Sequence, residues 1–131
     1  MKYLLDTVAW LWSVGPAEKL GKQALEILSV GDEDIYFSAA SALEIAIKTR
    51  IGKYRLPEDP SRYIPKRLAE QGIQPLPVTQ AHALRVYSLP RHHRDPFDWL
   101  IIAQAMTENL VILTSDRLFE KYSVDVVWCG K

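Results

Sequence analysis

The chain has 131 residues, 48% of them apolar and 24% charged, which is the size and composition of one ordinary globular domain spanning residues 1–131. Its single cysteine, Cys129, excludes an internal disulfide and a cysteine-based metal site, and no apolar run approaches the roughly 18 residues that a membrane helix needs. The formal net charge is zero, but residues 46–94 carry 10 Lys and Arg against 3 Asp and Glu between two acidic flanks, a distribution that suits either phosphate binding near carboxylates or a solvated basic face.

The first part of the chain alternates short strands with helices. Strands are expected over 2–6 and 34–38, and helices over 7–14, 16–31 and 39–53. Pro16 suits the first position of its helix, while Gly31 and Gly52 are typical of helix ends. The apolar start, YLLDTVAWLW, lacks the basic residues and cleavage site of a signal peptide. We therefore expect a cytoplasmic protein.

The second part continues the alternation. Helices are expected over 59–73, 79–89, 96–109 and 117–124, and strands over 74–78, 110–116 and 125–128. Pro65 predicts that the helix over 59–73 is broken into two parts. The prolines in QPLPV (74–78) favour an edge strand, and Thr79 is typical of a helix cap. LVILTSD (110–116) is the clearest strand of the chain.

Strands that alternate with helices predict an α/β protein with a mainly parallel sheet and helices on both faces. Ligands of such sheets bind at the carboxyl ends of the strands. Asp6 and Asp116 end two predicted strands at that edge, and Glu44 lies on the second turn of a helix that starts there. Asp98 lies in the first turn of its helix, and the edge that this turn meets depends on how the chain is threaded. Asp6 and Asp116 could also simply cap the helices that follow them.

The other acids also have local explanations. Glu44 could form a capping box with Ser41 or an ion pair with Lys48, four residues on. Asp95 is typical of a helix N-cap, and Asp98 would gain from the helix dipole. Local explanations of this kind leave open whether these carboxylates have a shared function.

Carboxylates brought together by the fold would repel each other by about 4 kcal/mol per close pair at an effective dielectric near 20. A bound cation removes that cost. Oxygen ligands, without cysteine and without histidines in i,i+4 pairing, suit Mg²⁺ or Mn²⁺ rather than zinc. Such ions activate water for attack on a phosphodiester, and the basic middle of the chain would hold the backbone of a nucleic acid.

Four segments carry a resemblance to a known family. YLLDT (3–7), SAASALEIAIKTRIGK (38–53), HHRDPFDWLIIAQA (92–105) and ILTSDRLFEKYSV (112–124) together resemble the PIN-domain toxins of the VapC type. The resemblance implies a three-layer α/β/α sandwich and a metal-dependent endoribonuclease that uses Mg²⁺ or Mn²⁺. It also implies an RNA substrate, a VapB-type antitoxin that blocks the active site, and a homodimer.

The family's four acids fall on four positions of this chain as catalytic, metal-binding residues: Asp6, Glu44, Asp98 and Asp116. Supporting roles around them are implied for Asp95, Thr7 and Ser115. Contacts with RNA or antitoxin are expected for Arg91, His92, His93, Arg94 and Lys48, although the loop that carries four of them could also be merely solvated. The chain departs from the family pattern at Leu43, where Trp is common, and at Trp99, where Arg is common.

Two other functions compete with the nuclease. A catalytically inactive PIN-like module could bind RNA or an antitoxin without cutting. A phosphotransferase of the haloacid dehalogenase type would also begin with a strand ending in Asp, but it needs a second Asp two residues later, where this chain has Val8. Dependence of RNA cleavage on both a divalent ion and Asp6 would separate the nuclease from either alternative.

Overall fold

A five-stranded parallel sheet forms the centre of the computed structural model, which describes residues 1–29 and 31–131. Its strands are β1 (Lys2–Leu5), β2 (Asp34–Ser38), β3 (Gln74–Leu76), β4 (Val111–Thr114) and β5 (Val126–Trp128). They follow the order β3-β2-β1-β4-β5, and every neighbouring pair is parallel. The five predicted strands are thus confirmed, and the proline-containing β3 lies at an edge, where its missing N–H groups break no ladder.

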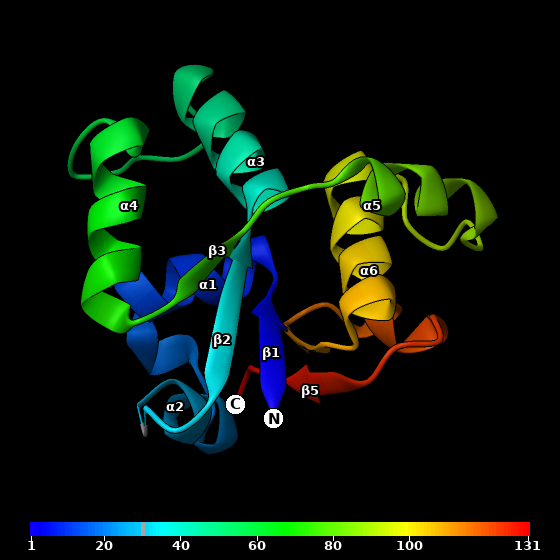
Figure 1. The fold of residues 1–131 in the computed structure, drawn as a ribbon. Helices are drawn as coiled ribbons and strands as arrows, with labels where there is room; N and C mark the ends of the chain where they lie inside the picture. Colours follow the sequence, from blue (N-terminus) through cyan, green and yellow to red (C-terminus); the bar gives the residue numbers. More distant parts are fainter. Residues whose placement is uncertain (30) are drawn as a thin grey trace.

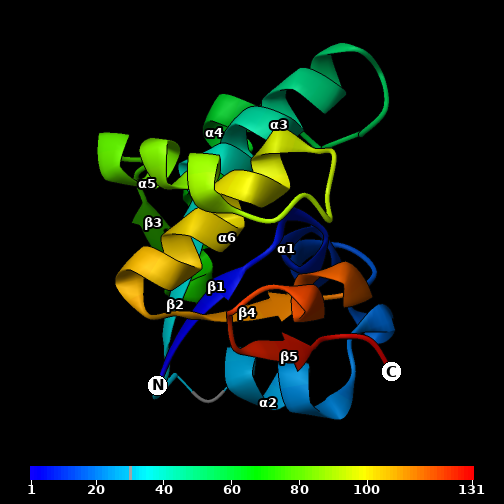
Figure 2. The same cartoon turned by 90° about the vertical axis from the view of Figure 1, so that its right-hand side faces the viewer.

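Helices cover both faces of this sheet (Figure 1). They are α1 (Thr7–Val14), α2 (Lys22–Ser29), α3 (Ala39–Arg50), α4 (Pro60–Gln71), α5 (Gln80–Arg85) and α6 (Pro96–Glu108). Short 3₁₀ helices are η1 (Ala17–Lys19), η2 (Val86–Ser88) and η3 (Arg117–Lys121). Figures 1 and 2 show α1, α2 and α4 on one side of the sheet and α5 and α6 on the other. The predicted α/β/α sandwich is therefore confirmed.

The two faces of the sheet have separate hydrophobic cores. Leu5 on β1 packs with Trp10 of α1 and with apolar residues of α2 and α4, whereas its neighbour Leu4 packs with Ile101 and Ile102 of α6. All five side chains are at most 1% exposed. Alternate residues of a strand face opposite sides of a sheet, so this central strand joins both cores and fixes where its carboxyl end lies.

Pro65 does not break its helix, contrary to the sequence prediction. The helix α4 continues through Pro65 from Pro60 to Gln71. Its apolar residues Tyr63, Ile64 and Leu68 are buried against the sheet, while Pro65 itself is exposed. The carbonyl that loses its hydrogen bond to Pro65 can therefore be hydrated, and packing of the apolar face outweighs the local cost.

The helix predicted over 16–31 is also interrupted. It is divided into η1 and α2 at Leu20 and Gly21, and of its predicted residues, residue 30 lies outside the described part. Leu20 is buried and bridges Gly130, while the Gly21 N–H donates to the Cys129 carbonyl at 2.9 Å. The segment after β5 thus replaces helical hydrogen bonding here, an effect of residues more than 100 positions away.

We expect Gly21→Ala to lower the free energy of unfolding by about 1–3 kcal/mol, because an added methyl group must displace packed backbone. A Cβ at residue 21 would lie 2.3 Å from the Gly130 carbonyl oxygen. Urea denaturation measures the change, and Lys22→Ala, at the next and exposed position, is the control. Equal midpoints for the two variants would contradict this reading of the close approach.

None of the helices in the described residues is long and apolar enough to cross a membrane.

Candidate active site

A cleft of about 200 Å³ opens at the carboxyl ends of β1 and β4. All four predicted ligands line it, together with the three residues predicted to support them and with Lys48. These lining residues are Asp6, Thr7, Glu44, Lys48, Asp95, Asp98, Ser115 and Asp116. Residues from four separate segments therefore meet at the sheet edge at which parallel α/β proteins bind ligands.

Asp6 is held at the bottom of this cleft. It follows β1 and is only 5% exposed. One carboxylate oxygen accepts the N–H of Ala9 at 2.7 Å and so caps α1, and the other accepts the hydroxyl of Thr114. Burial raises the pKa of Asp6 to about 6, although the hydrogen bonds from Thr114 and Ala9 oppose the rise. One side chain thus both caps α1 and lines the cleft.

Glu44 reaches the cleft from α3 and is also 5% exposed. Its Oε1 accepts the hydroxyl of Thr7 at 2.6 Å, and its Oε2 pairs with Lys48, as the i,i+4 spacing predicted. The capping box with Ser41 does not form; the Ser41 hydroxyl instead lies 2.9 Å from that of Thr7. Burial lowers the pKa of Lys48, but the hydrogen bond and charge of Glu44 outweigh it. The net effect is a raised pKa, so Lys48 brings a positive charge to the cleft.

The threading of the chain decides where Asp98 lies. The helix α6 precedes β4, which runs parallel to its neighbours in the sheet. Such a helix starts near the carboxyl ends of the strands and runs antiparallel to them, so the N-terminus of α6 lies at the cleft. Asp95 caps this helix by accepting the N–H of Phe97 at 2.8 Å, which confirms its predicted local role. Asp98 lies in the first turn of α6 and lines the cleft.

Burial and the neighbouring carboxylates both disfavour the ionised form of Asp98. Burial raises its pKa to about 8, and the charges of Asp95, Glu44, Asp6 and Asp116 raise it in the same direction. A carboxyl group that resists ionisation at neutral pH is the electrostatic mark of a crowded acidic site. A divalent cation would relieve this repulsion, and the oxygen-rich set of donors fits a hard ion such as Mg²⁺ or Mn²⁺.

Asp116 completes the site after β4. Its Oδ1 caps η3 by accepting the N–H of Leu118 at 2.9 Å, and its backbone N–H donates to Thr114 at 2.9 Å. Its Oδ2 lies 2.9 Å from Nε2 of His93. Thr114 therefore links Asp6 and Asp116, the acids that follow the two central strands.

His93 was expected to contact RNA or antitoxin with the other residues of its loop, and its burial argues against such a contact. Its ring packs against those of Phe119 and Tyr122, and the residue is 6% exposed. Atoms of His93, Asp98 and Asp116 that could bind a metal lie within 4.8 Å of one another. No local pattern predicted its burial, because the residues that surround it, Asp116, Phe119 and Tyr122, lie more than 20 positions further along the chain.

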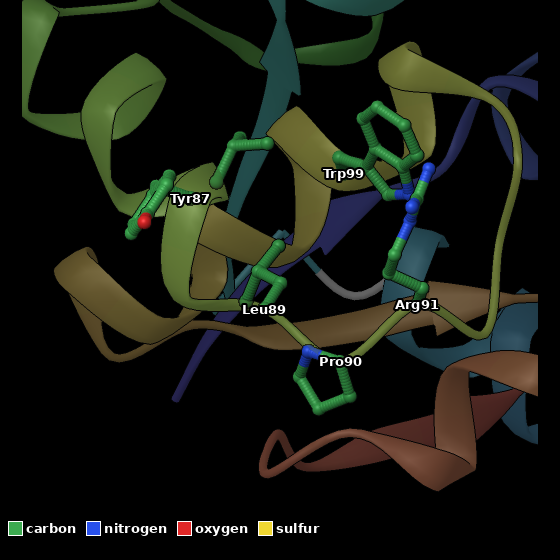
Figure 3. Close-up of a pocket in the computed structure, with 6 residues that line it drawn as sticks. Tyr87, Leu89, Pro90, Arg91 and Trp99 are labelled. Atoms are coloured by element: carbon green, nitrogen blue, oxygen red, sulfur yellow. The ribbon is translucent and has the colours of Figure 1, made fainter.

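The other loop residues expected to contact RNA or antitoxin are exposed and do not line the acidic cleft: Arg91, His92 and Arg94. Arg91 instead borders a separate pocket of about 260 Å³, where its side chain extends toward Trp99 (Figure 3). The indole N–H of Trp99 donates to the carbonyl of His93 at 2.8 Å. Trp99, one of the two departures from the family pattern, thus holds the loop that carries His93.

Comparison with known proteins agrees with this geometry. The PIN domain family model matches residues 3–125. The chain is 50% identical over 48 residues to Ribonuclease VapC16 of Mycobacterium tuberculosis; this stretch covers 37% of the chain and 34% of that protein, so the match spans about a third of the relative.

Solved structures share the fold at low sequence identity. VapBC2 from Rickettsia felis, bound to a DNA fragment from its promoter, has a TM-score of 0.75 at 16% identity and covers 99% of this chain and 100% of that one. A toxin-antitoxin complex from Klebsiella pneumoniae has a TM-score of 0.63 at 17% identity and covers 96% of each chain. Because the PIN domain family model matches residues 3–125, nearly the whole chain, the chain belongs to the PIN domain family.

Proposed function

We propose that this protein is a metal-dependent endoribonuclease and the toxin of a toxin-antitoxin pair. The observation that carries the proposal is the convergence of Asp6, Glu44, Asp98 and Asp116 on one cleft, with the pKa of Asp98 raised to about 8. A protein gains nothing in stability from such crowding, so the arrangement is best explained by a bound cation. The family and the named ribonuclease relative support phosphodiester hydrolysis as the reaction.

The four acids would hold Mg²⁺ or Mn²⁺. When bound, such an ion polarises a phosphoryl oxygen and lowers the pKa of a water molecule that attacks the phosphodiester. Thr7 orients Glu44 through its hydroxyl, and Thr114 orients Asp6, so two hydroxyl groups fix the direction of two of the carboxylates.

Positive charge beside the acids would hold the RNA. Lys48 lies at the cleft, with its ammonium group 5.5 Å from the centre of the Tyr54 ring, and would offer a positive charge to a phosphate of the RNA. The exposed Arg91, His92 and Arg94 lie outside the cleft and would contact the RNA backbone there, with the charge supplied by the two arginines. They could equally contact an acidic segment of an antitoxin.

A VapB-type antitoxin and a second copy of the chain are proposed as partners, and the cytoplasm as the place of action. The likeness of the fold to VapBC2 and to the toxin-antitoxin complex supports the antitoxin, while the second copy and the cytoplasm rest on the resemblance to VapC-type toxins.

Purified, antitoxin-free protein should cut total bacterial RNA into discrete fragments when Mg²⁺ or Mn²⁺ is present. EDTA and Asp6→Asn should each abolish these fragments, because the carboxylate of Asp6 would be needed to bind the ion. Gel electrophoresis of the RNA gives the readout. Asp34→Asn is the matched control, since this exposed Asp is the first residue of β2 and lies at the amino ends of the strands, away from the cleft.

The same experiment tests the inactive-module alternative. If the folded wild type binds RNA without cutting it, and Asp6→Asn leaves toxicity in cells intact, the enzymatic proposal fails. The phosphotransferase alternative has no support here, because position 8 is Val and the chain belongs to the PIN domain family.

A further inference from the structure

We propose that His93 is a positioning residue that holds Asp116 through an Nε2–H hydrogen bond, and that Tyr122 fixes the tautomer of its ring. The role of Asp116 as a metal ligand rests on the proposed function. The arrangement itself rests on contacts among His93, Tyr122 and Asp116, and it can be tested in the metal-free protein.

The phenol oxygen of Tyr122 accepts two backbone hydrogen bonds. The N–H of His92 donates to it at 3.2 Å and the N–H of His93 at 2.9 Å. A phenol oxygen has two lone pairs, so these bonds use its acceptor capacity. Tyr122 is 5% exposed, and its own O–H therefore needs an acceptor within the protein.

Nδ1 of His93 is that acceptor, 3.1 Å from the phenol oxygen. A nitrogen that accepts a hydrogen bond carries no proton, so in the neutral ring the proton lies on Nε2. Nε2–H then donates to Oδ2 of Asp116 at 2.9 Å. The result is a directed chain of hydrogen bonds from Tyr122 through His93 to Asp116.

Packing holds the ring in this orientation. His93 lies 4.7 Å from the ring of Phe119 and 5.4 Å from that of Tyr122, measured between ring centres, and is nearly parallel to the latter. Its Nε2 is also 3.8 Å from Oδ2 of Asp98, too far for a hydrogen bond but close enough for the N–H dipole to act on both carboxylates. His93 thus orients Asp116 and offsets part of the repulsion between two acids.

The alternative is that His93 binds the metal directly with Asp98 and Asp116. Direct binding through Nε2 requires that nitrogen to lose its proton, which would move the proton to Nδ1. Nδ1–H would then face a phenol oxygen that already accepts two N–H groups, and the O–H of Tyr122 would lose its acceptor. The contacts of Tyr122 therefore favour positioning over direct binding.

Nitrogen-15 NMR of the three histidines distinguishes these roles without any activity assay. We expect a proton on Nε2 of His93 in the metal-free protein and the same proton after addition of Mg²⁺. The spectrum of His93→Gln, which lacks these signals, makes the assignment. An Nδ1–H tautomer without a proton on Nε2, or loss of the Nε2 proton on addition of Mg²⁺, would overturn the proposal.

Two substitutions test the role toward Asp116. His93→Leu removes the donor, and Mn²⁺ affinity measured by calorimetry should fall about 10- to 100-fold, the usual effect of losing a partner of a metal ligand. His93→Gln offers an amide N–H in a similar place and should recover most of the affinity. In the cleavage assay, the loss for His93→Leu should appear in kcat rather than in KM for RNA.

His82→Gln is the matched control, because His82 is another buried histidine that contacts a carboxylate, Glu108 at 2.8 Å, at the far end of α6. It should leave Mn²⁺ affinity unchanged. If folded His93→Leu binds Mn²⁺ and cuts RNA like the wild type, the positioning role is wrong. If instead the wild type neither binds Mn²⁺ nor cuts RNA, the proposed function fails, while the tautomer still decides the hydrogen-bond assignment.

Discussion

Replacing Asp98 by Asn is expected to abolish RNA cleavage and at the same time to stabilise the metal-free protein at neutral pH. Activity should fall at least about 100-fold, because a catalytic metal ion supplies several kcal/mol of transition-state stabilisation. Stability should rise because the wild-type carboxyl must either remain protonated or ionise among other acids, with a pKa of about 8. Asparagine carries no such cost, so we expect the melting temperature to increase by about 5 °C or more.

Thermal unfolding in EDTA and RNA cleavage in Mn²⁺ measure the two effects on the same preparation. Asp125→Asn, at an exposed position outside the cleft, should change neither. An active Asp98→Asn variant would remove this residue from the proposed ligands. A variant that is inactive but less stable than the wild type would mean that Asp98 serves the fold rather than the site, because a functional acid in a crowded cleft should be a burden on stability.

The metal-free protein should lose stability as the pH rises from about 4 to about 8. The pKa of Asp6 is raised from 3.8 to about 6 and that of Asp98 from 3.8 to about 8. Between the ordinary and the raised value the folded state holds a proton that the unfolded state has released, so the slope of stability against pH is negative. Each pKa unit corresponds to about 1.4 kcal/mol, which makes the combined loss several kcal/mol.

Mn²⁺ should reverse this trend, because the cation binds the ionised carboxylates of the folded protein and stabilises it by an amount that grows with the logarithm of the free Mn²⁺ concentration above Kd. Melting temperatures measured over this pH range, with and without Mn²⁺, test both statements. The double variant Asp6→Asn with Asp98→Asn should show a much flatter profile and little response to Mn²⁺. A wild-type profile that rises with pH in EDTA would show that the acids are not crowded in solution.

Much of the fold follows from local signals in the sequence. The alternation of apolar strands with amphipathic helices predicted all five strands, and the prolines of β3 indicated its place at an edge. Asn109 ends α6 in a left-handed conformation with φ of 56°, as a residue of its type can. Asp6 and Asp116 could be assigned to the carboxyl edge because both directly follow strands of a parallel sheet.

Other features depended on contacts that local patterns do not contain. The helix over 59–73 survives Pro65 because its apolar face is buried, and the helix over 16–31 is interrupted because the C-terminus pairs with Leu20 and Gly21. The fold also decided which edge Asp98 meets and buried His93 beside Asp116 and Tyr122, 23 and 29 residues away. The sequence alone predicted the strands, most of the helices and the acids of this protein, since caps and periodicity act within a few residues. Only the tertiary structure decided how side chains from distant segments share one cleft.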